Sequence, residues 1–445
     1  MERYYSFEEL VILFTSRTGT ALEYADENDV IHTVSYSELA DKINSAVAEI
    51  RASGARVDAI YAEHTPETIV RIFADVIAGC DVVIADPVVS QEALDQVSAI
   101  ALATHDARRA SRNFYDVNDE GSGLIRPDEG ELLFFTSGTT ERSKIVRLTS
   151  YSFCASAWSG QTMLPCGPGD KMLSILPLAH VFGFVCSMLW GLAYGATVAL
   201  GRDVRHILDD TLFFHPTILP VVPSVIGAML RFDTLNPEIR VALVAAAPCT
   251  PEVTAALRAR GMDVYLGYGL TETSSGITIT QDLDDPYAQY VCTGTDIRIE
   301  NDGEISVSTP CMMQGYLGGP QMEPGERFFT GDLGSWDDQG RLLLKGRKKD
   351  VLIMADGTKI YCPEYEDELA ARTGITDLGI IMKDGHAVLA AAAGSDEEAL
   401  RAAIAEFNRP VMRSQQIYDV IITDGPLPRT ATGKLKRYEL QAQFS

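Results

Sequence analysis

The alternation of short apolar segments with amphipathic helical segments limits this chain most strongly to one class of fold. Residues 58–63 have the pattern of a short strand, and residues 67–79 repeat apolar side chains at the helical period. Residues 81–85 then centre on three branched apolar side chains, as in strands buried within parallel sheets. The same order recurs over residues 241–266, where Thr250 has the character of a helix N-cap. This order predicts an α/β fold with mainly parallel sheets.

The pattern changes after about residue 293. Strand-like pieces between residues 296 and 345 alternate with turn sequences, which predicts a β-rich subdomain closing a large, multi-subdomain domain. Beyond a basic stretch, the last hundred or so residues have strands of their own and a helix at residues 396–407, as expected for a small α+β domain. We therefore expect a large N-terminal domain over residues 1–348 and a small C-terminal domain over residues 349–445.

One long apolar run raises the question of a membrane span. Residues 172–200 contain no Asp, Glu, Lys or Arg, which is long enough for a spanning helix. Pro177, His180 and three glycines interrupt the run, which favours a buried strand, a turn, and a helix leading into a second strand. No signal-peptide pattern follows Met1, and the eight scattered cysteines form no C-x-x-C pair. We expect a cytoplasmic protein with no membrane span and reduced thiols.

The formal net charge of −25 makes nucleic acids and anionic membrane surfaces poor partners, because both would repel the chain. Basic residues nevertheless gather at residues 345–359 and 429–437. Such local positive sites are what an acidic protein needs to hold a phosphorylated ligand, although charge runs are also common on solvated faces.

The segment with the clearest chemical character is residues 132–144. An apolar strand runs into a loop of hydroxyl side chains and glycine that ends at a lysine; the loop residues are Thr136, Ser137, Gly138, Thr139, Thr140 and Lys144. Glycine lets the backbone approach a ligand, hydroxyl and N–H groups donate to phosphate oxygens, and lysine neutralises charge. The spacing is not that of a Walker loop. Taken alone, the segment fits a phosphate site or an exposed Ser/Thr turn.

This segment resembles the phosphate loop of the AMP-dependent synthetase and ligase superfamily, which contains acyl-CoA synthetases, peptide-synthetase adenylation domains and firefly luciferases. Further segments follow the order of that family's motifs along the chain. They are residues 176–183, 245–248, 268–272, 330–332, 346–350 and 428–434. The resemblance extends from near residue 20 to the end of the chain.

The resemblance implies how a nucleotide is held. Adenine is expected to lie along Ala246 and against the ring of Tyr268, in a segment that continues through Gly269. Thr271 is expected to contact phosphate, and Glu272 to hold Mg²⁺ and to act in catalysis. The implied ligands are ATP, Mg²⁺ and, as acceptor, coenzyme A.

Further residues have implied roles outside the adenine and phosphate contacts. Asp332 is expected to accept hydrogen bonds from the ribose hydroxyls, and Arg347 to reach the ribose. Lys349 matches the pivot on which the family's small domain swings, so we expect the C-terminal domain to be mobile. Lys434 matches the catalytic lysine of the C-terminal loop. His180 matches the residue beside the acyl pocket and is also expected to act in catalysis.

These roles agree with the chemistry. A carboxylate that attacks the α-phosphate of ATP brings two anions together, so cations must stabilise the growing charge. Lys434 would supply one beside the carboxylate, and Lys144 another beside the leaving pyrophosphate. The sequence therefore predicts an AMP-forming acid–thiol ligase of the acyl-CoA synthetase type.

The branch of the family is indicated by the segment around His180. Its neighbours are apolar, and no Asp is present to hold an amino acid's ammonium group, so we expect an acyl or aryl acid and a place in fatty acid metabolism. Two alternatives stay open: a ligase that loads a carrier protein's phosphopantetheine arm, and a nucleotide-binding protein without turnover. The second is suggested by Glu141, which stands where the family usually has Gly; Ser143 likewise replaces Pro. The large domain is also shorter than usual between Pro87 and Glu131.

Overall fold

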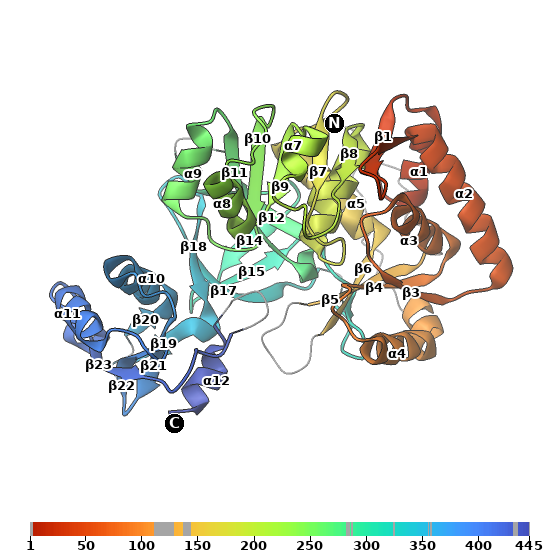
Figure 1. The fold of residues 1–445 in the computed structure, drawn as a ribbon. Helices are drawn as coiled ribbons and strands as arrows, with labels where there is room; N and C mark the ends of the chain where they lie inside the picture. The colour runs from red at the N-terminus through yellow and green to blue at the C-terminus, as the bar shows by residue number, and fades with distance from the viewer. Residues whose placement is uncertain are drawn as a thin grey trace.

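The computed structural model describes residues 3–110, 129–136, 144–281, 285, 288–323, 325–354, 356, 358–429 and 435–444. These residues form a large body and a smaller C-terminal body, which is connected to the large body next to strands β17 and β18 (Figure 1). The large body contains a thirteen-stranded and a five-stranded sheet, and the small body contains sheets of two and three strands. The predicted α/β class with a separate C-terminal domain is confirmed.

The five-stranded sheet has the order β16-β6-β5-β4-β3. Its strands are β3 (Val57–Tyr61), β4 (Asp81–Ala85), β5 (Glu131–Phe135), β6 (Ile145–Thr149) and β16 (Gly315–Tyr316). Strands β3, β4 and β5 are parallel to one another. Strand β6 is antiparallel to β5, and β16 is antiparallel to β6. Helix α3 (Pro66–Ala78) joins β3 to β4, as the sequence pattern predicts, and α4 (Gln91–Ala110) follows β4. The side chain of Thr65 caps α3 by accepting a hydrogen bond from the N–H of Thr68.

The thirteen-stranded sheet has a parallel half and an antiparallel half. The order is β14-β15-β17-β18-β13-β12-β11-β10-β9-β7-β8-β1-β2, and the parallel pairs run from β11 to β1. The strands of the parallel half are β1 (Thr20–Ala25), β7 (Lys171–Ser174), β8 (Thr197–Leu200), β9 (Ile218–Val221), β10 (Val241–Ala245) and β11 (Asp263–Leu270). The antiparallel strands are β2 (Ile31–Ser35), β12 (Ser275–Thr280), β13 (Gln289–Val291), β14 (Asp296–Ile299), β15 (Glu304–Ser308), β17 (Phe328–Trp336) and β18 (Leu342–Arg347). The segment expected to form a β-rich subdomain therefore continues the same sheet.

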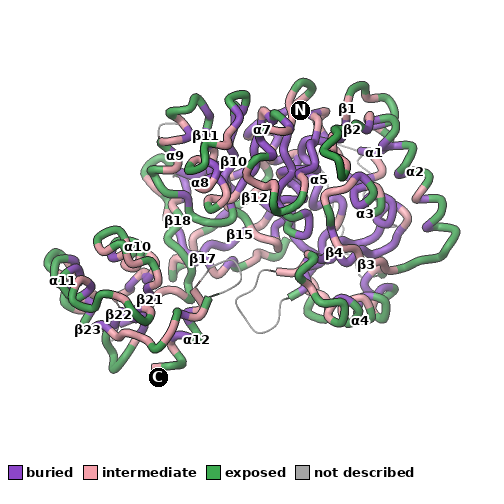
Figure 2. The backbone as a smooth tube through the Cα atoms, in the orientation of Figure 1, coloured by how far each residue is buried: buried purple, intermediate pink, exposed green. Residues whose placement is uncertain are grey.

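Helices in addition to α3 and α4 surround a mainly buried interior (Figure 2). They are α1 (Phe7–Ser16), α2 (Tyr36–Ser53), α5 (Ser150–Met163), α7 (Asp210–Phe214), α8 (Pro223–Phe232) and α9 (Pro251–Arg258). Helix α9 begins as predicted, with Thr250 accepting a hydrogen bond from the N–H of Val253.

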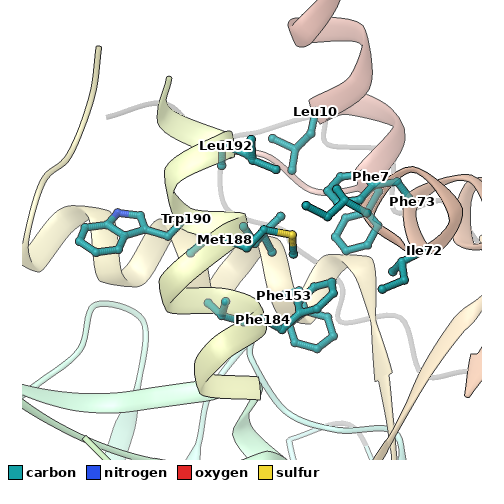
Figure 3. Packing of buried hydrophobic residues seen from close by; sticks show 14 of the residues in the cluster. Phe7, Leu10, Ile72, Phe73, Phe153, Phe184, Met188, Trp190 and Leu192 are labelled. Atoms are coloured by element: carbon teal, nitrogen blue, oxygen red, sulfur yellow. The ribbon is translucent and has the colours of Figure 1, made fainter. Parts of the chain in front are cut away.

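The uncharged run at residues 172–200 folds as strand, turn, helix and strand, but its helix is unusual. It is a π-helix, η1 (Gly183–Leu189), that continues into the short α-helix α6 (Trp190–Tyr194). Phe184, Met188 and Leu192 point toward the aromatic cluster of α1 and α3, whereas Trp190 points away from it (Figure 3). Local π-helical segments frequently occur at functional sites. No helix within the described ranges is long and apolar enough to cross a membrane.

The small body has a core of its own. Its elements are β19 (Val351–Ile353), β20 (Lys359–Tyr361), α10 (Cys362–Thr373), β21 (Leu378–Lys383), β22 (His386–Ala391), α11 (Glu397–Phe407), β23 (Ile417–Ile422) and α12 (Arg437–Ala442). Leu369, Leu389 and Phe407 are among its buried residues. Helix α11 matches the predicted helix and is capped by the Asp396 side chain. All eight cysteines are free thiols.

A buried carboxyl group in α3 makes the stability of this fold depend on pH. Asp75 has 0 % relative exposure, and its Oδ2 accepts from Arg71 Nε at 2.8 Å, which also donates to Asp58 Oδ2 at 2.8 Å. Burial, followed by the charge of Asp58, raises the pKa of Asp75 from 3.8 to about 7. Between pH 3.8 and about pH 7, Asp75 is protonated in the folded chain but ionised in the unfolded chain. The free energy of unfolding therefore falls as pH rises through this range.

We expect Asp75→Asn to abolish this fall, because the amide does not titrate. Between pH 5 and pH 8 the parent should lose roughly 2 kcal/mol that the variant retains. Denaturant unfolding of both proteins at the two pH values measures the difference. Parallel pH dependence in parent and variant would show that Asp75 is ionised throughout.

Candidate functional site

A cavity of about 930 Å³ lies at the ends of the parallel strands, where open α/β sheets bind ligands. Its walls come from α5, η1, β11 and β12, from the segments that follow β5, β9 and β10, and from the start of the small body. Ten of the predicted site residues line it: Thr136, Lys144, His180, Ala246, Tyr268, Gly269, Thr271, Glu272, Arg347 and Lys349. Ser137, Gly138, Thr139, Thr140, Glu141, Ser143 and Lys434 lie outside the described residues.

Asp332, another predicted site residue, does not line the cavity but contacts two side chains that do. Its Oδ2 accepts from the hydroxyl of Tyr268 at 2.7 Å, and its Oδ1 pairs with Arg347 Nε at 2.7 Å. Burial and then the Asp332 charge raise the pKa of Tyr268, so the phenol stays protonated and donates. The carboxylate thus orients two cavity-lining side chains, and a carboxylate with two acceptor oxygens has the chemistry that the predicted ribose contact requires.

Around Glu272, on another part of the cavity wall, three side chains form a chain of contacts. Lys144 Nζ lies 4.5 Å from the ring centroid of Tyr316, and the Tyr316 hydroxyl donates to Glu272 Oε1 at 2.8 Å. Burial, followed by Glu272, raises the pKa of Tyr316. Tyr316 could not be predicted from its local sequence, because only the antiparallel pairing of β16 with β6 brings it beside the residues that flank the predicted phosphate loop.

The chemistry of this site fits a magnesium ion held partly by a ligand. Glu272 brings one carboxylate to the cavity wall. Within the described ranges, no cluster of three or more His, Cys, Asp or Glu side chains could hold a metal by itself. Mg²⁺ is commonly held by one or two carboxylates together with substrate phosphates, so a single carboxylate beside the predicted phosphate site fits the ion.

The backbone around the predicted adenine contacts is strained or tightly packed. Ala246, directly after β10, has φ +71°, and Ser274 and Ser275 also have positive φ. Such conformations cost of order 1–3 kcal/mol in non-glycine residues and cluster at ligand sites. Gly269 cannot be replaced without movement, because a Cβ there would lie 1.8 Å from the carbonyl oxygen of Ser275.

The far part of the cavity is mainly apolar. Its lining there includes Ala157 and Gly160 of α5, Leu164 directly after that helix, and Val181, Val185, Cys186 and Trp190 in and around η1. The indole of Trp190 donates to Gln161 Oε1 at 2.6 Å, which fixes the ring. His180 also lines the cavity, and desolvation lowers its pKa, so the imidazole is neutral at pH 7.

The start of the small body closes the nucleotide side. Lys349, Asp350 and Leu435 all line the cavity. Leu435 directly follows the predicted catalytic lysine and pairs with Arg429 across an antiparallel bridge. Partial burial lowers the pKa of Lys349.

Known proteins share this fold and parts of this sequence. Residues 101–317 match the family described as AMP-binding enzyme. A 2-succinylbenzoate–CoA ligase of Bacillus velezensis is 28% identical over 428 residues, covering 86% of each chain. A methyl-dioxo-octahydro-indenyl-propanoyl:CoA ligase of Mycobacterium tuberculosis is 30% identical over 358 residues, covering 72% of this chain and 68% of the relative. The structure of O-succinylbenzoate coenzyme A synthetase from Bacillus subtilis, in complex with ATP and magnesium ion, superposes with a TM-score of 0.77 at 23% identity and covers 99% of both chains.

An α/β body of this topology followed by a small C-terminal body is the architecture of the adenylate-forming enzymes. The chain belongs to the AMP-dependent synthetase and ligase superfamily. The family predicted from the sequence motifs is confirmed, and with it the class of AMP-forming ligases. The roles assigned to individual site residues remain predictions.

The contact between Tyr316 and Glu272 can be tested by removing one oxygen atom. Tyr316→Phe keeps the ring beneath Lys144 but loses the hydrogen bond to the carboxylate. We expect acyl-adenylate formation to slow about tenfold, as for one charge-assisted hydrogen bond. Pyrophosphate exchange measures the rate, with the exposed Tyr438→Phe as matched control. Parental rates in Tyr316→Phe would show that the contact does not position Glu272.

Asp332→Ala should weaken ATP binding by roughly 1–3 kcal/mol, because it removes a buried acceptor and leaves Tyr268 and Arg347 without their partner. Isothermal titration calorimetry with ATP measures the loss. A dissociation constant equal to that of the parent would contradict the ribose assignment.

Proposed function

We propose that this protein uses ATP to convert a carboxylic acid into its acyl-adenylate and then transfers the acyl group to the thiol of coenzyme A. The observation that carries the proposal is one continuous cavity with two kinds of lining. One part presents Lys144, Glu272, Arg347 and the Tyr268–Asp332 pair, and the other is mainly apolar. Such a cavity suits a nucleotide triphosphate joined to an apolar acyl group.

The nucleotide side supplies binding and charge stabilisation. Thr136 and Lys144 would hold the β- and γ-phosphates, Thr271 the α-phosphate, and Ala246, Tyr268 and Gly269 the adenine. Asp332 and Arg347 would bind the ribose. Glu272 would hold Mg²⁺ together with the phosphates, and the ion would supply charge neutralisation there. Glu272 itself is held in place by the hydroxyl of Tyr316.

Formation of the adenylate joins the acid's carboxylate oxygen to the α-phosphorus and releases pyrophosphate. Lys434 is our proposed catalytic residue for this step, because a cation is needed where the two anions meet. The position of its neighbour Leu435 on the cavity wall supports this assignment. The division at residues 348 and 349, with Lys349 as pivot of a mobile small domain, remains part of the proposal.

The acyl side favours an acyl or aryl acid without an amino group. The charged side chains on the described cavity wall are Lys144, Glu272, Arg347, Lys349 and Asp350. All of them lie on the part proposed to bind the nucleotide or at the start of the small body. His180 is neutral beside apolar neighbours. We propose it as a residue that contacts the acid, and propose fatty acid metabolism as the setting.

Coenzyme A is the favoured acceptor because the similar proteins reported above are named as coenzyme A ligases. A carrier protein's phosphopantetheine arm ends in the same thiol and is the alternative acceptor. Eight free thiols support a cytoplasmic location.

ATP–pyrophosphate exchange with a panel of straight-chain, branched and aryl carboxylic acids tests the first step. Coenzyme A and a phosphopantetheinylated carrier protein, offered in parallel, test the second. Exchange with at least one acid followed by thioester formation on coenzyme A supports the proposal. The absence of exchange with all acids, while ATP still binds, would favour a nucleotide-binding protein without turnover.

Within that assay, Lys434→Ala should lower adenylate formation by at least about a hundredfold while largely sparing thioester formation from supplied acyl-adenylate. The lysine charge is needed only where the carboxylate meets ATP. Lys436→Ala, two residues further on, is the matched control. An equal loss in both half-reactions of a folded Lys434→Ala protein would assign the lysine a different role.

A further inference from the structure

Glu304, the first residue of β15, is a buried carboxylate whose two oxygens have different partners. Its Oε1 accepts from the N–H of Gly331 at 2.9 Å, and its Oε2 accepts from Lys348 Nζ at 2.7 Å. The side chain is only 12% exposed. One carboxylate therefore joins the turn that carries Asp332 to the segment that precedes Lys349.

On the turn side, Glu304 acts together with its neighbour in β15. The hydroxyl of Thr330 donates to the carbonyl of Ile305 at 2.9 Å and accepts from the N–H of Asp332 at 3.0 Å. Gly331 has φ +72°, a conformation that glycine adopts without strain. Glu304 and Ile305, at the start of β15, thus hold this turn at two adjacent points, and the position of the turn fixes the position of Asp332.

On the hinge side, the ammonium of Lys348 lies between Glu304 Oε2 and Asp302 Oδ2, both at 2.7 Å. The hydrogen bond to Asp302, followed by that to Glu304, raises the pKa of Lys348. On the other side of Lys349, Asp350 Oδ1 pairs with Arg437 Nε of α12 at 3.2 Å. The two neighbours of Lys349 are therefore anchored to different bodies.

We propose that Glu304 is a positioning residue that holds the ribose-binding turn and the large-domain end of the hinge as one unit, so that rotation of the small domain is confined to Lys349. The inference rests on the proposed domain rotation. It explains why one buried carboxylate serves both segments: the pivot keeps a constant position relative to the nucleotide, and the lysine loop returns to the same place after each rotation. Misplacement by about 1 Å can cost a hundredfold in rate.

Two variants separate the two contacts. Glu304→Gln keeps an amide oxygen that can accept from Gly331 but loses the charge that binds Lys348, whereas Glu304→Ala loses both. We expect Glu304→Gln to bind ATP within about threefold of the parent and Glu304→Ala to bind about tenfold more weakly, as for one lost hydrogen bond to a charged group. Calorimetry with ATP measures both.

Limited trypsin digestion reports the hinge directly, because residues 347–349 are Arg-Lys-Lys. In both Glu304 variants, cleavage within this segment should be about fivefold faster than in the parent, as expected when one ion pair no longer opposes local opening. The thermal midpoint should stay near that of the parent. Glu300→Gln, which changes an acidic residue of the same hairpin whose side chain contacts Ser306 instead, should be cleaved at the parental rate.

A double-mutant cycle completes the test. Glu304→Gln and Lys348→Met should each slow overall turnover about tenfold. The double variant should be no slower than Lys348→Met alone, since that single change already removes the contact to Glu304 along with the contact to Asp302. Three results would each overturn the proposal. They are cleavage of Glu304→Gln at the parental rate, an equal loss of ATP affinity in Glu304→Gln and Glu304→Ala, and additive losses of turnover in the double variant. A parent that binds ATP but forms no adenylate overturns the proposed function instead, and the binding and cleavage results still decide the role of Glu304.

Discussion

The geometry of the cavity wall depends on the two contacts that the carboxylate of Asp332 makes with Tyr268 and Arg347. Asp332 lies on β17 opposite Arg347 of β18, and it accepts from Tyr268 of β11, so it joins three strands of the antiparallel and parallel halves of the large sheet. A buried carboxylate is costly unless its oxygens are paired, and these two partners stabilise it. Because both partners line the cavity and Arg347 leads directly into Lys348 and Lys349, the geometry of the predicted ribose site and the geometry of the connection between the two bodies are set together.

The rest of the nucleotide side follows the same principle of indirect support. Tyr316 reaches Glu272 and Lys144 from a strand of two residues, and Glu304 reaches Gly331 and Lys348 from the edge of β15. None of these supporting side chains needs to touch a substrate. They restrict the orientations of the side chains that are predicted to contact substrate. Such restriction holds a site in the exact geometry that attack of a carboxylate on a phosphate requires. The strained backbone at Ala246 and Ser275 is stable in such a frame because the sheet on either side prevents its relaxation.

Local patterns predicted the elements whose periodicity is strong. Helix α3, strands β4 and β10, and helix α11 lie within a residue or two of the expected ranges, because period and capping are properties of a few consecutive residues. The uncharged run was correctly interpreted as buried protein, but its π-helix was not foreseen, since the hydrogen-bond pattern of a helix depends on packing that apolar composition does not specify. The sequence also did not predict that the β-rich segment joins the large sheet, because pairing between distant strands has no signature in the local sequence of either strand.

The sequence by itself determined the family and the chemistry that ten cavity-lining residues could support, because motifs of fixed spacing carry hydroxyl, carboxylate and ammonium groups to the ends of strands. Only the tertiary structure decided which side chains hold them there. Tyr316 and Glu304 have no distinctive local pattern, and each contacts a charged residue 44 positions away along the chain. Their roles arise from register between strands, a long-range property that depends on how the whole sheet closes. The sequence names the groups that act on a ligand, and the folded sheet supplies the distances and orientations at which they act.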